Sequence, residues 1–82
     1  MEIKTFYKTQ RELAINLNNL IDAYWENQIS EPFLVSKIKL IYENNPGKMI
    51  KFGEFTTILK QHCGKKRLEI VSKVIYIKTE ES

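Results

Sequence analysis

Residues 53–77 read GEFTTILKQHCGKKRLEIVSKVIYI, and this stretch decides the expected fold. It predicts a short helix over about 54–62, a break at Gly64 and a longer helix over about 65–76. Gly64 is typical of a residue that ends a helix in a left-handed conformation. Apolar side chains span nearly half of the longer helix, as in the central helix of a small bundle. The run Val74–Ile77 also has strand-like composition, so its pairing with residues 1–5 as a short terminal strand pair stays open as an alternative.

Two amphipathic helices are predicted before this stretch. The first runs over about 10–28, because residues 9–12 (TQRE) match a capping box and one apolar stripe follows. That stripe contains Leu13, Leu17, Leu20, Ile21, Tyr24 and Trp25. The second runs over about 31–44, with Ser30 as its N-cap.

The segment NNPG at 44–47 is expected to stop the second helix with a type II turn. Residues 48–52 should then form a connector without a sheet. The sequence therefore predicts an all-α fold, a single domain over 1–82 built as a small bundle of four helices with a short third one.

Composition narrows the classes of function. The chain has 82 residues, a net charge of +3 and one cysteine, which rules out an internal disulfide and fits a reducing compartment. No apolar run is long enough to span a membrane, and the N-terminus lacks the apolar core of a signal peptide. We therefore expect a cytoplasmic protein without a membrane partner.

Positive charge is concentrated in the second half of the chain, where residues 37–73 carry nine cations and three anions. Lys65, Lys66 and Arg67 open the last predicted helix, where the helix N-terminus already favours anions. This pattern predicts phosphate contacts with a nucleic acid. The cations assigned to that surface are Lys65, Lys66, Arg67, Lys48, Lys51 and Lys60.

A structural explanation of these cations competes with binding. Lysines on helix faces are usually just solvated, and Arg67 falls inside an apolar arc, where it would pair with Glu54 or Asp22. A helix-turn-helix reading fits poorly, because Lys60 occupies a position that needs a small residue. Few aromatic residues lie near the cations in the sequence, so phosphate contact is expected rather than base stacking.

A second apolar side on the helix over 31–44 indicates a protein interface. Phe33 and Leu40 lie away from the main stripe, with Lys37 nearby. A helix that is apolar on two sides either threads between neighbours or offers one side to a partner. We therefore expect a protein partner or a homodimer that uses Phe33, Lys37 and Leu40.

No catalytic constellation is recognisable. His62 and Cys63 are the only residues of their types, and adjacent helical positions point about 100° apart, so they form neither a metal site nor a nucleophile–base pair. The expectation is a non-enzyme without cofactor, metal or small-molecule substrate. A non-catalytic interaction module is the first functional hypothesis, and a nucleic-acid-binding accessory protein is the second.

The segments GEFT at 53–56 and GKKRL at 64–68, with KTFYKTQRELAINLNNLIDAYWENQIS at 4–30, resemble a family of short uncharacterised bacterial proteins. The resemblance covers nearly the whole chain. It implies a complete small protein of one domain, and it implies no known activity and no functional residue.

Overall fold

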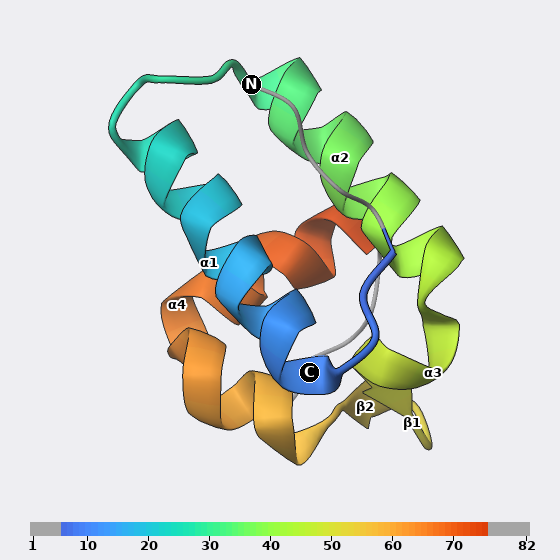
Figure 1. The fold of residues 1–82 in the computed structure, drawn as a ribbon. Helices are drawn as coiled ribbons and strands as arrows, with labels where there is room; N and C mark the ends of the chain where they lie inside the picture. Colours follow the sequence, from blue (N-terminus) through green and yellow to red (C-terminus); the bar gives the residue numbers. More distant parts are fainter. Residues whose placement is uncertain (1–5, 76–82) are drawn as a thin grey trace.

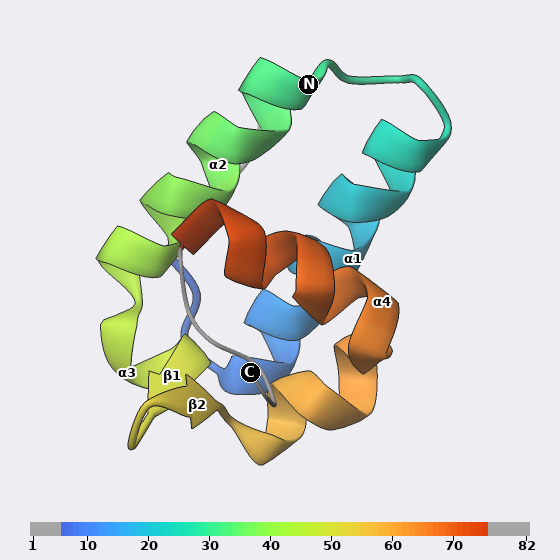
Figure 2. The same ribbon diagram turned by 180° about the vertical axis from the view of Figure 1, so that it is seen from behind.

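The computed structural model describes residues 6–75, and within them the fold is all-α, as predicted, with one small hairpin added. Figures 1 and 2 show α1 and α2 side by side, with α4 lying across them. α1 packs more extensively on α4 than on α2. The elements are α1 (Gln10–Trp25), α2 (Glu31–Asn44), α3 (Pro46–Met49), β1 (Ile50–Lys51), β2 (Glu54–Phe55) and α4 (Thr57–Ile75).

Side chains from all four helices meet in one core. α1, α2 and α4 present their apolar faces to one another, and α3 contributes Met49. The burial of these side chains drives the association of the helices. The largest fully buried side chains are Tyr7, Leu13, Leu17, Leu20, Ile21, Leu34, Ile38, Ile41, Met49, Leu59, Val71 and Asn45.

The first turn of α1 confirms half of the predicted capping box. Thr9 is the N-cap, and its Oγ1 accepts a hydrogen bond from the backbone N–H of Glu12 at 3.1 Å. This bond satisfies one of the donors that a helix start leaves without a partner.

The last turn of α1 differs from the prediction, since the helix ends at Trp25 rather than near Gln28. Asn27 has a φ of 63°, and its N–H donates to the Tyr24 carbonyl at 3.0 Å. The N–H of Gln28 donates to the Ala23 carbonyl at 2.8 Å. These two bonds form a Schellman motif with asparagine in place of the usual glycine. Helical periodicity alone does not reveal such a stop.

α2 has the predicted bounds and the predicted N-cap, with Ser30 Oγ accepting from the Phe33 N–H at 3.3 Å. The type II turn expected at Pro46 and Gly47 was wrong, because the short helix α3 begins there. Gly47 lacks the positive φ that the third residue of a type II turn requires, so residues 46–49 form a helical turn. The hydrogen bond from the Lys48 N–H to the Asn45 carbonyl, at 3.0 Å, is compatible with either arrangement.

The buried side chain of Asn45 also fixes the N-terminal segment. Its Nδ2 donates to the Ile41 carbonyl at 2.8 Å, and its Oδ1 accepts from the backbone N–H of Tyr7 at 3.1 Å. Asn45 therefore joins the end of α2 to a residue 38 positions away.

The expected sheet-free connector over 48–52 was also wrong, because β1 and β2 form an antiparallel hairpin. Phe55 brings the second strand down onto the core, where its ring is buried. The helix predicted from Glu54 therefore begins only at Thr57, after Thr56, whose Oγ1 accepts from the Leu59 N–H at 3.3 Å.

Gly64 breaks α4 as predicted, with φ 82° and ψ 169°. The positive φ was expected, but the ψ places it outside the left-handed helical region, in a region that essentially only glycine adopts. Val74 and Ile75 continue the helix beyond the break. Residues 1–5, 76 and 77, which the alternative terminal strand pair needs, lie outside the described residues.

Candidate interaction surface

Arg67 connects the second half of α4 to the last turn of α1. Its Nε and Nη2 both donate to Asp22 Oδ1, at 3.1 and 2.8 Å, and its Nη1 donates to the Cys63 carbonyl at 3.2 Å. Carbonyls at the end of a helical segment lack a partner in the next turn, and Arg67 supplies one just before the break. Of the two internal partners considered from the sequence, Asp22 is the one that Arg67 contacts, whereas Glu54 pairs with Lys60.

Trp25 lies against the same guanidinium. Arg67 Cζ is 5.6 Å from the centroid of the indole, and the Trp25 side chain remains 47% exposed. A guanidinium over an aromatic face is attracted by the ring quadrupole. Sequence reasoning placed Trp25 in the buried stripe of the first helix and so missed this contact.

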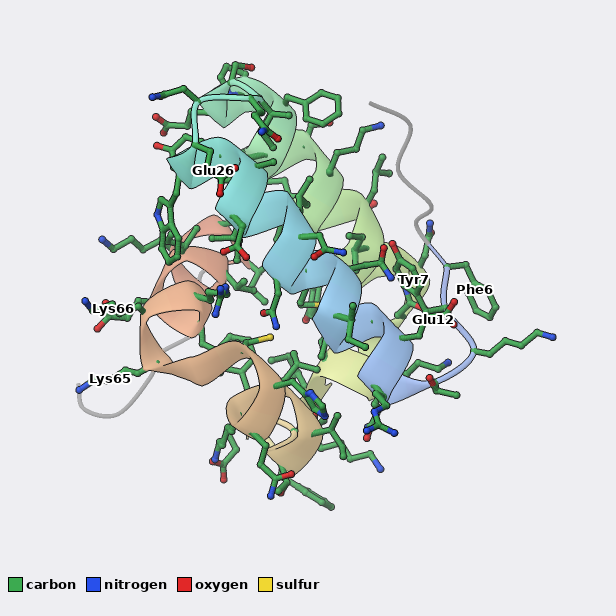
Figure 3. All side chains as sticks on the ribbon, turned by 60° about the vertical axis from the view of Figure 1, so that its left-hand side comes forward. Phe6, Tyr7, Glu12, Glu26, Lys65 and Lys66 are labelled. Atoms are coloured by element: carbon green, nitrogen blue, oxygen red, sulfur yellow. The ribbon has the colours of Figure 1, made fainter. Side chains whose placement is uncertain are left out.

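Lys65 and Lys66 extend this region into solvent. Both are exposed, and Figure 3 shows them pointing outward on the side of the molecule where Glu26 follows the end of α1. We call Asp22, Trp25, Glu26, Lys65, Lys66 and Arg67 the α1/α4 surface. It carries charges of both signs around one half-exposed indole.

The other three predicted cations lie elsewhere. Lys48 Nζ is 5.2 Å from the centroid of the Phe6 ring, and Figure 3 shows Phe6 on the opposite side from Lys65 and Lys66. Lys51 belongs to β1. The structure therefore does not gather the six predicted cations on one face.

Lys60 forms an ion pair with Glu54, with Nζ 2.7 Å from Oε1. The hydrogen bond and the positive charge of Lys60 lower the pKa of the Glu54 carboxyl. Both side chains are largely exposed, so salt screens this pair.

The predicted interface on α2 is less apolar than its sequence indicated. Phe33 is only partly exposed and packs against the core, and Lys37 Nζ lies 5.3 Å from the centroid of its ring. Leu40 is 39% exposed. Phe33 and Lys37 are thus brought together, while Leu40 offers the larger apolar exposure of this side.

His62 and Cys63 differ in burial, since Cys63 is buried and His62 is only partly buried. Burial raises the pKa of the Cys63 thiol to about 11, and the thiol donates to the Ala14 carbonyl at 3.8 Å. The His62 carbonyl accepts from Asn18 Nδ2 at 2.8 Å. Residues 6–75 contain no group of three or more His, Cys, Asp or Glu placed to hold a metal ion. In the same residues, every helix is too short or too polar to cross a bilayer.

A family model described as a conserved hypothetical protein matches residues 4–76. The chain belongs to this family. The match includes α1 to α4 and the hairpin, and the family description assigns no activity. No curated protein and no solved structure matches the chain significantly.

Proposed function

We propose that this protein is a non-catalytic, cytoplasmic interaction module that forms a homodimer through the α1/α4 surface. The observation that carries the proposal is the contact between Trp25 and Arg67, in which a half-exposed indole lies against an arginine held by two acceptors. Tryptophan and arginine are enriched among the residues that dominate binding energies. Side chains already held in place lose less freedom on association.

The charges of this surface support a second copy as the partner. The charges of Asp22 and Arg67 offset each other in their ion pair. Glu26 carries negative charge, and Lys65 and Lys66 carry positive charge on the same side. A surface with both signs is able to pair with itself across a twofold axis. A chain of 82 residues buries only about 60–65% of its surface on folding, so association also adds stability.

Cys63 supports a role without covalent catalysis. A thiol with a pKa of about 11 is almost entirely protonated at neutral pH, and the thiolate is the reactive form. The chain has no second cysteine with which it would pair.

Sedimentation equilibrium at micromolar concentration tests the homodimer. We expect a dimer for the natural chain and a roughly ten-fold or larger rise in Kd for Trp25→Ala, because a central aromatic contact typically contributes at least that much. Leu40→Gln is the matched control, since it removes an exposed apolar side chain from α2 and leaves the α1/α4 surface intact.

The outcomes separate the possible interfaces. A chain that stays monomeric at all concentrations contradicts the homodimer. A dimer that Leu40→Gln weakens and Trp25→Ala leaves unchanged moves the interface to Phe33, Lys37 and Leu40, the surface that the sequence indicated.

Nucleic-acid binding is the second candidate, favoured by the exposed Lys65 and Lys66, which precede Arg67 in the chain. Arg67 lies against the half-exposed indole of Trp25. An indole face stacks on bases, and lysines contact phosphates. Fluorescence anisotropy with duplex and single-stranded oligonucleotides over a salt series tests it. Binding that weakens steeply with salt, with a shallower dependence after Lys65→Gln and Lys66→Gln, supports this function. If no oligonucleotide binds at low salt, nucleic-acid binding is excluded.

A further inference from the structure

The tip of the β1–β2 hairpin carries a residue that its backbone does not favour. Phe52 and Gly53 join the two strands with φ angles of 53° and 81°, which is the pattern of a type I′ turn. Asparagine and glycine are the residues that suit such a turn, whereas a bulky residue at positive φ is an outlier. The folded chain is therefore less stable with phenylalanine at this position than it would be with asparagine.

The Phe52 ring also does not pack against the protein core. Its side chain is 100% exposed, more than that of any other large apolar residue among residues 6–75. The loop projects from the edge of the molecule, below α3 in Figure 1. A strained backbone and a fully exposed ring are two separate costs at one position, which points to a role outside the folded chain.

The surroundings of the tip are positively charged. Lys51, next to Phe52, is exposed, and it lies opposite Glu54 in the strand register. The Glu54 carboxylate is already held by Lys60 at 2.7 Å. The charge of Lys60 offsets that of Glu54, so Lys51 leaves the hairpin with a net positive charge.

We propose that this hairpin tip inserts into the interface of an anionic lipid bilayer. The Phe52 ring enters the boundary between headgroups and acyl chains, while Lys51 meets the anionic headgroups. Aromatic side chains favour this boundary, and lysine stems extend along it with their charge in water.

The small area of the tip favours a bilayer over a protein pocket. A stable protein interface buries about 800 Å² on each partner and surrounds its central aromatic with further contacts. Here the neighbours of Phe52 in the hairpin do not extend that contact, because Phe55 is buried and Ile50 is partly buried in the core. A bilayer interface accepts a single projecting ring with a neighbouring cation and needs no matching shape.

Co-sedimentation with phosphatidylcholine vesicles, with and without phosphatidylglycerol, tests the proposal. We expect binding to the phosphatidylglycerol vesicles at low salt and a loss of roughly ten-fold or more for Phe52→Asn, the change expected from removing a fully inserted aromatic ring. Lys51→Gln should weaken binding and reduce its salt dependence. Ile15→Gln is the control, since it removes a 45% exposed apolar side chain from α1 and should leave binding unchanged.

Phe52→Asn keeps the chain folded, because asparagine suits the turn, so thermal unfolding should occur at the same or a higher temperature. The proposal is overturned if the natural chain ignores phosphatidylglycerol, or if Phe52→Asn binds the vesicles as well as the natural chain does. The proposal is also overturned if the chain does not bind the vesicles and Phe52→Asn instead abolishes binding to a protein. That result would assign the tip to a protein partner. None of these outcomes depends on dimerisation through Trp25.

Discussion

Arg67 and Asp22 are 45 positions apart in the chain, and two nitrogens of the arginine donate to one oxygen of the aspartate. The same guanidinium donates to the Cys63 carbonyl on the far side of the break. A single side chain thereby joins both halves of α4 to the last turn of α1. The angle between those halves is stabilised from outside the helix as well as by Gly64.

Removal of either partner should lower stability modestly. Asp22→Ala or Arg67→Ala should each reduce the free energy of unfolding by about 1 kcal/mol, since the side chains are 42% and 30% exposed and water screens them. Urea denaturation measures this loss. The double variant should lose less than the sum of the single variants, by about 0.5 kcal/mol. Strict additivity would show that the two residues do not stabilise each other.

Gly64→Ala should be among the more harmful small substitutions. An alanine at φ 82° and ψ 169° costs roughly 1–3 kcal/mol, even though no atom within 4 Å would meet its Cβ. Gly47→Ala is the matched control, because Gly47 also has open space around it, lies in α3 and has no positive φ. This change should stabilise the chain by about 0.5 kcal/mol. Thermal unfolding compares them, and equal effects would contradict the role assigned to the break.

A substitution at Asn27 should increase the stability of the fold. Asn27→Gly should raise the free energy of unfolding by a few tenths to about 1 kcal/mol, because glycine adopts a φ of 63° without a Cβ penalty. Asn27→Ala should lower it by about 1 kcal/mol. Urea denaturation of the pair measures both. If glycine and alanine behaved alike, the Schellman motif would contribute nothing to stability.

Alkaline pH should destabilise the fold. Burial raises the pKa of Cys63 from 9.0 to about 11, and burial together with the Glu12 charge raises the pKa of Tyr7 above 10.0. The folded chain therefore keeps protons that the unfolded chain releases. The stabilisation from Cys63 is complete below pH 9 and is lost as the pH rises through about 11. That from Tyr7 is complete below pH 10 and is lost as the pH rises through its raised pKa.

Unfolding by urea at pH 8 and pH 11 measures this loss. Cys63→Ala should show a smaller difference between the two pH values, since the thiol no longer titrates. Tyr7→Phe should also reduce the difference. A natural chain that is equally stable at both pH values would contradict the burial of these groups.

Much of the fold could be predicted because it depends on local signals. The Thr9 cap, the Ser30 cap and the break at Gly64 each follow from a few neighbouring residues. The hairpin could not be predicted in this way, because strands of two residues are too short to show alternation. A turn of Phe52 and Gly53 also lacks the asparagine that usually marks a type I′ turn.

The candidate site was only half predictable. Apolar spacing placed Arg67 inside the core-facing arc, which indicated an internal carboxylate partner and left Asp22 and Glu54 as alternatives. The prediction that Trp25 belongs to the buried stripe of the first helix was wrong for a physical reason. Trp25 is the last residue of α1, and 47% of its surface stays in solvent.

The extensive packing of α1 on α4 has a consequence for how fast the chain folds. These helices are separated in the chain by α2, α3 and the hairpin. Their contact therefore requires closure of a long loop, which lowers the conformational entropy of the chain before the contact stabilises it. Folding rates fall as contacts become more distant in sequence. Stopped-flow refolding should therefore be slower than for a bundle whose helices each pack on the next one along the chain.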